Sequence, residues 1–290
     1  MKDYELNKIL ELHQKWLNAE EGGVRANLQG VNLQGIDLHK ADLRGANLCG
    51  ADLRESNLCE ANLSTTNLWE ANLRKANLYE ANLSEAILYG ADLFKVNLCK
   101  ANLCETNLSC ARLFGANLSE TNLYKTNLWR ADLRWSNLCK ANLLGSNLRN
   151  ADLRGADLRE AKLQETELYG ACLWEATNIP YIPLACPERG SFTAFKKCGE
   201  YIVELLIPAD AKRSSATTRK CRANYAKVLS ITTLDGEIAK TDKVMNSIYS
   251  SDTVYKVGEY VYPDAFDENR WYECSHGIHF FVNRQEAVEY

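Results

Sequence analysis

The sequence has little proline and glycine, no long apolar run and no excess of charge of one sign. Its 290 residues include 5 Pro and 16 Gly, and 34 Lys and Arg stand against 38 Asp and Glu, for a formal net charge of -4. This composition excludes collagen-like, mucin-like and strongly charged disordered chains. There is no run of about 18 or more apolar residues, and the first residues lack the basic and apolar stretches of a secretory signal. We therefore expect a folded, cytoplasmic protein without a membrane-spanning segment.

The cysteine content also excludes one class of protein. Eleven Cys would suggest a disulfide scaffold in a short secreted chain, but this chain is long and begins without an export signal. We expect reduced, free thiols.

The dominant feature of the sequence is a period of five residues. From Ala26 to Glu175 the chain divides into thirty consecutive blocks of five without an insertion or deletion. The third position is Leu in all thirty blocks, the first is Ala in nineteen, and the second is Asn or Asp in twenty-five. A repeat this regular indicates a solenoid or a similar array.

The period restricts the fold. Five residues of an α-helix advance by about 500°, so successive Leu side chains would not share a face. On a flat strand a step of five alternates faces and would place half of the Leu in water. A chain that turns a corner once per block keeps every Leu inside. The first and third positions then point inward, the second points outward, and the fourth and fifth form the turn.

These blocks resemble the pentapeptide-repeat family, whose motif is A-(D/N)-L-x-x. The resemblance covers 150 of the 290 residues, at 26–175. It implies a mainly β protein built on a right-handed quadrilateral β-helix, with four blocks per coil and the first and third positions packed inside. Family members often dimerise end to end through the terminal coil, but the residues that follow the repeat can block that end, so both monomer and homodimer remain open.

Five blocks lack Asn or Asp at the second position. Two departures, Ile87 and Arg112, are isolated, and each is either a contact site or a tolerated outward substitution. The other three, in the last three blocks, indicate that the pattern decays toward a different domain: Lys162, Glu167 and Cys172.

With four blocks per coil, residues twenty apart share a face of the solenoid. On the first face the fourth positions are Cys49, Trp69, Tyr89, Ser109, Trp129, Arg149 and Tyr169. On the second face they are Arg54, Arg74, Phe94, Phe114, Arg134, Arg154 and Trp174. These side chains are spaced to stack, either as a strip that binds a partner or nucleic acid, or only along the solenoid itself. The binding candidates are Trp69, Tyr89, Phe94, Phe114, Trp129, Arg134 and Arg154.

The third face has alternating charges and cysteines. Its fifth positions, among them Lys40, Glu60 and Glu80, predict an exposed salt-bridge ladder of little energetic weight. Cys59, Cys99 and Cys139 lie two coils apart, which is too far for disulfides.

Charge bears on one function that the resemblance suggests. Some pentapeptide-repeat proteins imitate DNA and bind type II topoisomerases, giving quinolone resistance. Residues 26–175 contain 18 acidic and 16 basic side chains, a net of -2. A nearly neutral rod disfavours this alternative without excluding it.

The segment before the repeat predicts a cap. In residues 1–25, Leu6, Ile9, Leu10, His13, Trp16 and Leu17 recur at helical spacing, which predicts an amphipathic helix over 3–18 that ends before Gly22-Gly23. We expect this helix to cover the first coil, with His13 as a packing residue.

After the repeat the composition changes. Residues 176–186, with Pro180 and Pro183, read as a linker, and 187–290 as an α+β domain. Strands are predicted over 201–207, 223–232 and 254–261, with a turn at Asp235-Gly236 and a short final helix capped at Asn283. The domain resembles an uncharacterised one that follows repeats in bacterial and phage proteins, through Ile207-Pro208-Ala209-Asp210-Ala211-Lys212-Arg213-Ser214-Ser215, Tyr255-Lys256-Val257-Gly258-Glu259 and Cys274-Ser275-His276-Gly277-Ile278-His279-Phe280-Phe281.

A basic segment in this domain is a candidate ligand site. Residues 212–227 contain six Lys or Arg and no acid, interleaved with Ser and Thr. They form either a phosphate cradle for a nucleotide, nucleic acid or other anion, or a solvated strand edge. The candidate residues are Arg213, Arg219, Lys220 and Arg222.

Two further chemistries receive weaker support. Cys274, His276 and His279 are metal-ligand types without paired spacing, so we expect no metal or other cofactor. Residues 277–281 followed by 286–290 resemble the strand-then-helix segment of ADP-ribosyltransferases, an alternative in which the domain would bind NAD. We expect instead a non-catalytic interaction or scaffold protein whose final domain recognises a partner or ligand.

Overall fold

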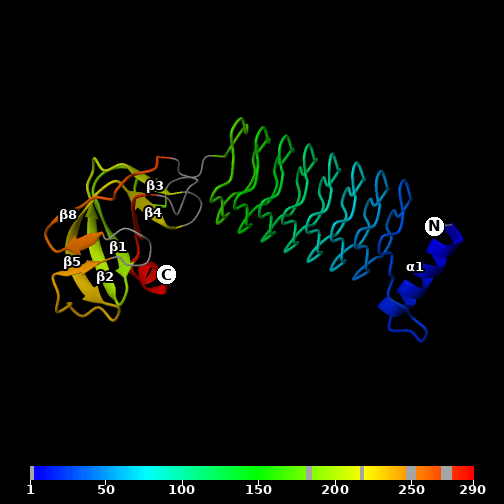
Figure 1. Ribbon diagram of the computed structural model, residues 1–290, viewed down its shortest axis with the longest axis horizontal. Helices are drawn as coiled ribbons and strands as arrows, with labels where there is room; N and C mark the ends of the chain where they lie inside the picture. The colour runs from blue at the N-terminus through cyan, green and yellow to red at the C-terminus, as the bar shows by residue number, and fades with distance from the viewer. Residues whose placement is uncertain (1–2, 181–184, 216–218, 246–252, 269–275) are drawn as a thin grey trace. The chain divides into compact units, whose positions relative to one another are not determined.

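The computed structural model describes residues 3–180, 185–215, 219–245, 253–268 and 276–290. The chain forms two compact units, Met1–Tyr181 and Ile182–Tyr290. The first unit holds an N-terminal helix and the stacked coils of the repeat. Among the described residues, strands β1 to β9 and a short helix belong to the second unit (Figure 1).

The N-terminal helix, α1 (Asp3–Leu17), lies against the start of the repeat. Its inward residues Leu6 and His13 are buried, and His13 Nδ1 accepts the backbone N–H of Ala26 at 3.1 Å. Gly23 packs so closely on the helix that a Cβ there would lie 2.4 Å from the backbone nitrogen of Trp16. The predicted helix is confirmed, and this close approach requires a glycine at position 23.

The repeat forms a β-helical solenoid whose coils contain twenty residues. Parallel bridges join second-position residues twenty apart, from Asn27↔Asn47 through Asp157↔Thr177. Between successive coils, the N–H of Leu48 donates to Asn67 O at 2.7 Å and the N–H of Asn47 donates to Ala26 O at 2.9 Å. Four blocks therefore make one coil, as the family resemblance implied.

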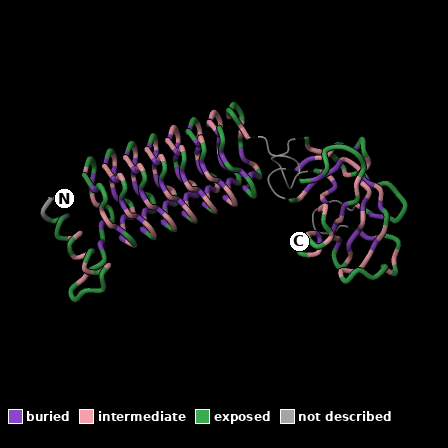
Figure 2. Tube along the Cα trace, turned by 180° about the vertical axis from the view of Figure 1, so that it is seen from behind, coloured by how far each residue is buried: buried purple, intermediate pink, exposed green. Residues whose placement is uncertain are grey.

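The first and third positions form the core of the solenoid, as the sequence predicted. Twenty-nine of the thirty Leu are buried, and Leu173 in the last block is half-buried. First positions are buried from Ala46 to Ala171, whereas Val31, Ile36 and Ala41 in the first coil are half-buried. Figure 2 shows the buried segments recurring in each coil.

The fifth position closes a tight turn with left-handed backbone geometry. All thirty fifth positions have positive φ, nine of them Gly and twenty-one other residues. In block 46–50, for example, Gly50 has φ +63°, and the next N–H, of Ala51, donates to Leu48 O at 3.0 Å. The sequence placed the turn at positions four and five, but the left-handed requirement was not predicted.

The second position carries ladders of side-chain amides. Nδ2 of Asn122 donates to Oδ1 of Asn102 at 2.9 Å, and Nδ2 of Asn102 donates to Oδ1 of Asn82 at 3.1 Å. The same Oδ1 of Asn102 accepts the N–H of Cys104 at 3.3 Å. An outward Asn thus supports its own turn and links neighbouring coils, which gives a physical reason for the preference at this position.

The second unit is rich in β-sheet. A four-stranded antiparallel sheet has the order β1-β2-β5-β8, a three-stranded sheet β3-β4-β9, and a two-stranded sheet β6-β7. The strands are β1 (Phe192–Cys198), β2 (Tyr201–Ile207), β3 (Arg213–Ser215), β4 (Cys221–Ala223), β5 (Ala226–Thr233), β6 (Lys243–Met245), β7 (Val254–Lys256), β8 (Tyr260–Val261) and β9 (Ile278–Phe280). A short helix, α2 (Arg284–Glu289), follows.

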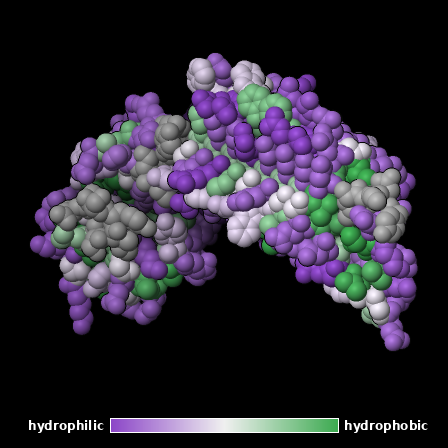
Figure 3. Space-filling model, turned by 45° about the vertical axis from the view of Figure 1, so that its right-hand side comes forward, coloured by the Kyte–Doolittle hydropathy of each residue, from purple (hydrophilic) through white to green (hydrophobic). Residues whose placement is uncertain are grey.

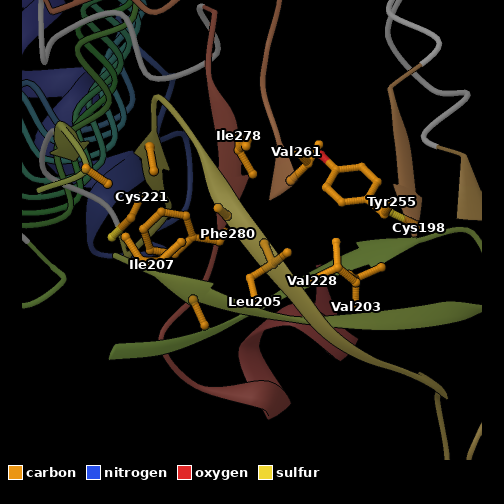
Figure 4. Close-up of a cluster of buried hydrophobic side chains, with 14 of the residues drawn as sticks. Cys198, Val203, Leu205, Ile207, Cys221, Val228, Tyr255, Val261, Ile278 and Phe280 are labelled. Carbon is orange, nitrogen blue, oxygen red and sulfur yellow. The ribbon is translucent and has the colours of Figure 1, made fainter. Parts of the chain in front are cut away.

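The core of this unit draws apolar side chains from all three sheets. Leu205 and Val228 come from the four-stranded sheet, Phe280 from the three-stranded sheet, and Tyr255 from β7 of the two-stranded sheet (Figure 4). Alternate residues of β1 and β2 are buried, the pattern expected of strands packed on one face.

Several predicted elements of this unit are confirmed and two are wrong. Strand 201–207, the turn at Gly236 and the helix cap of Asn283 are present. The single strand predicted over 223–232 is divided between β4 and β5. The strand predicted over 254–261 is likewise interrupted by a turn in which the N–H of Glu259 donates to Lys256 O and Gly258 has φ +85°.

Candidate interaction surface

The fourth-position side chains stand beside one another on successive coils, as predicted. On the first face, Trp69 and Tyr89 contact edge to face with ring centroids 6.1 Å apart, and 48% of Trp69 and 39% of Tyr89 remain exposed. On the same side of the coil, Ile87 occupies a second position and is 43% exposed. We call Trp69, Ile87 and Tyr89 the first-face patch.

Farther along the first face the aromatic rings are covered by cations. Trp129 is half-buried and the guanidinium of Arg130 lies 4.6 Å from its ring centroid. The guanidinium of Arg149 lies 5.4 Å from the ring of Tyr169. These cation–π contacts occupy ring faces that a partner would otherwise use.

The second face forms a continuous internal stack. Phe94 and Phe114 lie parallel with centroids 5.7 Å apart, and the guanidiniums of Arg74 and Arg134 cover the two ends at 4.4 and 5.4 Å. All four side chains come from consecutive coils, so the solenoid itself satisfies the stacking that the sequence indicated.

The arginines of the second face also bind carboxylates of their own chain. Arg134 donates to Asp132 in a bidentate arrangement at 2.7 Å from each nitrogen, and its Nε lies 3.6 Å from Asp152. Arg154 donates to the same Asp152 at 2.6 Å. Burial would raise the pKa of Asp152, but the hydrogen bonds of Arg154 hold that pKa below its usual range.

The two isolated departures from the repeat have different surroundings. Arg112 stands in a ladder of carboxylates, and its guanidinium lies 3.5 Å from Asp92, which also binds Arg74. Ile87 interrupts an Asn ladder between Asn67 and Asn107, and its aliphatic side chain can neither donate nor accept a hydrogen bond. Arg112 therefore has a partner in the structure, whereas Ile87 adds apolar surface.

Trp135 is one of the exposed aromatics that were not among the predicted candidates. Trp135 is 60% exposed and lies at a fifth position, where the repeat otherwise carries Gly or mainly polar residues. That unusual residue type at the turn was the signal that could have identified it.

The third face carries the predicted exposed ion pairs. Lys40–Glu60, Lys100–Glu80 and Lys140–Glu160 have N···O separations of 3.5, 3.6 and 4.0 Å. The ten cysteines in the described ranges are free thiols, in agreement with the sequence analysis.

The predicted basic cradle of the second unit is not assembled as one surface. Arg213 donates to the backbone carbonyls of Pro187, Gly190, Pro208, Ala209 and Ala211. Arg222 is only 1% exposed and donates to His276 O at 3.3 Å and to Ser214 Oγ at 3.4 Å. These two arginines hold loops and strands together, and their assignment to a ligand site stays a prediction.

The other two candidates lie at the surface beside α2. Arg219 pairs with Glu286, and Lys220 donates to the hydroxyl of Tyr290 at 2.7 Å. Thr217 and Thr218 of the same segment lie outside the described residues. Of the four candidate residues, Arg219 and Lys220 are therefore the accessible ones.

The segments considered for metal and NAD binding contribute largely to packing. Ile278 and Phe280 are buried in the core, and His279 pairs in register with Arg222 across β4 and β9. Cys274, the third residue of the suggested metal set, lies outside the described residues.

Each helix in the described part of the chain is too short or too polar to cross a lipid bilayer. In the view of Figure 3 the surface is mostly hydrophilic, with hydrophobic residues in small separate groups.

Comparisons with solved structures find pentapeptide-repeat proteins. HetL, a pentapeptide repeat protein involved in heterocyst differentiation regulation in the cyanobacterium Nostoc sp. strain PCC 7120, is 31% identical and covers 57% of this chain and 92% of its own, with a TM-score of 0.21. Rfr23 from the cyanobacterium Cyanothece 51142 is 28% identical and covers 56% of this chain and 91% of its own, with a TM-score of 0.18. Full-length QnrB1, a plasmid-mediated fluoroquinolone resistance protein, is 17% identical and covers 52% of this chain and 85% of its own, with a TM-score of 0.19.

Family profiles match both units. A family of unknown function, DUF5758, matches residues 182–287. Among functionally curated proteins no match is found. Pentapeptide repeats match residues 26–64, 61–99, 95–119, 116–155 and 141–176, which together span more than half of the chain. The chain belongs to the pentapeptide-repeat family and carries a DUF5758 domain at its C-terminal end.

Proposed function

We propose that this protein is a non-catalytic interaction protein whose solenoid binds a protein partner through the first-face patch. The observation that carries the proposal is the exposed apolar surface of Trp69, Ile87 and Tyr89. Exposed aromatic and aliphatic side chains that stand together on a polar surface are typical anchors of protein interfaces. Ile87 supports a binding role for the patch. An Asn at this position would continue the amide ladder, whereas Ile87 interrupts it and exposes apolar surface.

The geometry separates this patch from the other predicted binding candidates of the solenoid. Phe94, Phe114, Arg134 and Arg154 are engaged with one another or with aspartates, and Trp129 is covered by Arg130. A partner that used them would have to replace existing contacts. The first-face patch can be covered without that replacement, so its burial gives a net gain.

The proposal includes finer features that the sequence or the family resemblance implied. These are a right-handed winding of the four-sided coils, a cytoplasmic location, and a division of the chain at residues 1–25, 26–175, 176–186 and 187–290. In the second unit we propose recognition of a further partner or anionic ligand, with Arg219 and Lys220 as its accessible cations.

The test is the capture of a partner from soluble extract of the native host with the purified chain as bait, followed by affinity measurements on the isolated complex. Ile87→Asn should restore the amide ladder while removing the apolar surface, and Trp69→Ala should remove the largest ring. We expect each change to weaken binding by about tenfold or more.

The matched control is Trp135→Ala, which removes an even more exposed tryptophan outside the patch. It should leave the affinity unchanged. Equal capture by the Ile87→Asn, Trp69→Ala and Trp135→Ala variants, all with unchanged melting temperatures, would refute the proposed surface.

A further inference from the structure

The geometry points to a binding site for a divalent transition-metal ion, of the zinc class, on the third face of the solenoid at His39, Cys59 and Glu60. This site is independent of the first-face patch. The sequence predicted no metal here, because the ligands come from two blocks that are twenty residues apart.

The coil register brings the three residues together. His39 and Cys59 occupy fourth positions on successive coils of the same face, and Glu60 follows Cys59 at the fifth position. One ligand atom from each residue lies within 4.8 Å of the other two. Small rotations of the exposed His39 and Glu60 side chains can bring these atoms to bonding distance from one ion.

A hydrogen bond to the backbone favours one tautomer of the imidazole. His39 Nδ1 lies 3.0 Å from the backbone oxygen of Cys59. When Nδ1 donates its proton to this carbonyl, Nε2 keeps its lone pair for a metal. Metal-binding histidines commonly donate their second nitrogen to a carbonyl or carboxylate in this way.

The donor set selects the class of ion. One nitrogen, one sulfur and one oxygen suit Zn²⁺ and its spectroscopic substitute Co²⁺, whereas Ca²⁺ and Mg²⁺ prefer oxygen alone. Three protein ligands leave a fourth tetrahedral position to water. Cys59 is half-buried and the other two residues are exposed, so an ion can enter directly from solvent.

The same face provides internal controls. Cys99 and Cys139 also occupy fourth positions, but their neighbours one coil away are Tyr79, Ser119 and Arg159. No other described group of three His, Cys, Asp or Glu side chains comes together as these do. The nearby cation is Lys40, whose Nζ lies 3.5 Å from Glu60, so it competes with a metal for the carboxylate.

The test is a titration of the reduced, full-length protein with Co²⁺, followed by absorption spectroscopy. We expect one equivalent of Co²⁺ to produce thiolate charge-transfer absorption and intense visible bands, both lost on addition of Zn²⁺. Cys59→Ser should abolish the charge-transfer band, and His39→Gln should weaken the affinity by at least about tenfold. Lys40→Ala should tighten binding by up to about fivefold, because an exposed ion pair is lost.

Cys99→Ser is the control and should bind Co²⁺ as the wild type does. Melting temperatures without metal establish that each variant is folded. If Cys59→Ser does not fold, His39→Gln alone tests the site. Retention of the charge-transfer band in Cys59→Ser, unchanged affinity in His39→Gln, or an equal loss in Cys99→Ser would overturn the site.

Discussion

Each position of the five-residue block meets one local requirement. The third position fills the core, the second supplies an oxygen that accepts the N–H of the fourth, and the fifth takes a left-handed φ. Left-handed geometry is unfavourable for residues other than glycine by about 1–2 kcal/mol. Twenty-one such residues tolerate it because the backbone hydrogen bonds of two neighbouring coils hold each turn.

Gly155 combines this backbone requirement with a close approach. It has φ +69°, and a Cβ there would lie 2.7 Å from the ring of Trp135 on the preceding coil. We expect Gly155→Ala to lower the free energy of unfolding by about 1–2 kcal/mol for the backbone and by about 0.5–1.5 kcal/mol more for moving the Trp135 side chain. Chemical denaturation and the indole N–H resonance of Trp135 measure the two effects.

Gly50 provides the control for that prediction. It has φ +63°, and a Cβ added there would meet nothing within 4 Å beyond its own chain neighbours. Gly50→Ala should show the backbone effect alone. Equal destabilisation by the two substitutions, with an unmoved Trp135 resonance, would contradict the steric argument.

At the scale of elements, the helix α1 depends on the protonation state of one histidine. His13 is buried and its Nδ1 accepts a backbone N–H, which requires the neutral ring. Burial lowers the pKa of His13, although the charge of Asp42 acts in the opposite direction. As the pH falls, the unfolded chain binds a proton at His13 before the folded chain does. The stability that the neutral, buried ring provides is therefore full above about pH 6.5 and declines as the pH falls below that value.

His13→Met tests this dependence because it packs without titrating. The variant should be less stable at pH 7.5, since the hydrogen bond to Ala26 is lost. The difference from the wild type should shrink at pH 5.5, because only the wild type loses stability by proton uptake at this position. Urea denaturation at both pH values measures it, and a constant difference would show that His13 titrates normally in the folded chain.

The elements of the two units differ in how well the sequence predicts them. In the repeat, a position has the same environment in every coil, so Leu at the third position predicts both burial and the coil. In the second unit, short strands end at local turns: the strand pattern over 254–261 continues through Gly258, but the backbone turns there. The alternation of apolar and polar residues alone does not predict such an interruption.

For the whole molecule, the sequence indicated which side chains stack but not which of them are already satisfied. Phe94, Phe114 and Arg134 belong to the predicted strip, yet their partners lie in adjacent coils. Arg213 and Arg222 carry charge that suggests a ligand, but they bind carbonyls contributed by distant loops and strands. The carbonyl partners of these two arginines depend on tertiary contacts, which composition and spacing do not encode.

The charge distribution of the repeat bears on imitation of DNA. The thirty blocks make seven and a half coils, which at about 4.8 Å per coil give a rod about 36 Å long. B-DNA carries a negative charge for about every 1.7 Å of its axis, so a rod of that length would need roughly twenty negative charges to imitate it. Residues 26–175 have a net charge of -2, from 18 acidic and 16 basic side chains. Ten of the acidic side chains have a Lys or Arg nitrogen within 4.0 Å: Asp42, Asp52, Glu55, Glu60, Glu80, Asp92, Asp132, Asp152, Asp157 and Glu160.

We therefore expect the purified protein neither to inhibit DNA supercoiling by gyrase nor to protect gyrase from quinolones. The comparison is a triple variant, Arg54→Gln with Arg134→Gln and Arg154→Gln, which removes three positive charges and takes the net charge of the repeat from -2 to -5. On its second face Asp52, Asp132 and Asp152 would lose these arginine partners, so any inhibition should appear first in this variant. Potent inhibition by the wild-type chain would instead show that shape outweighs charge, and the interaction surface would then have to be sought along the whole rod.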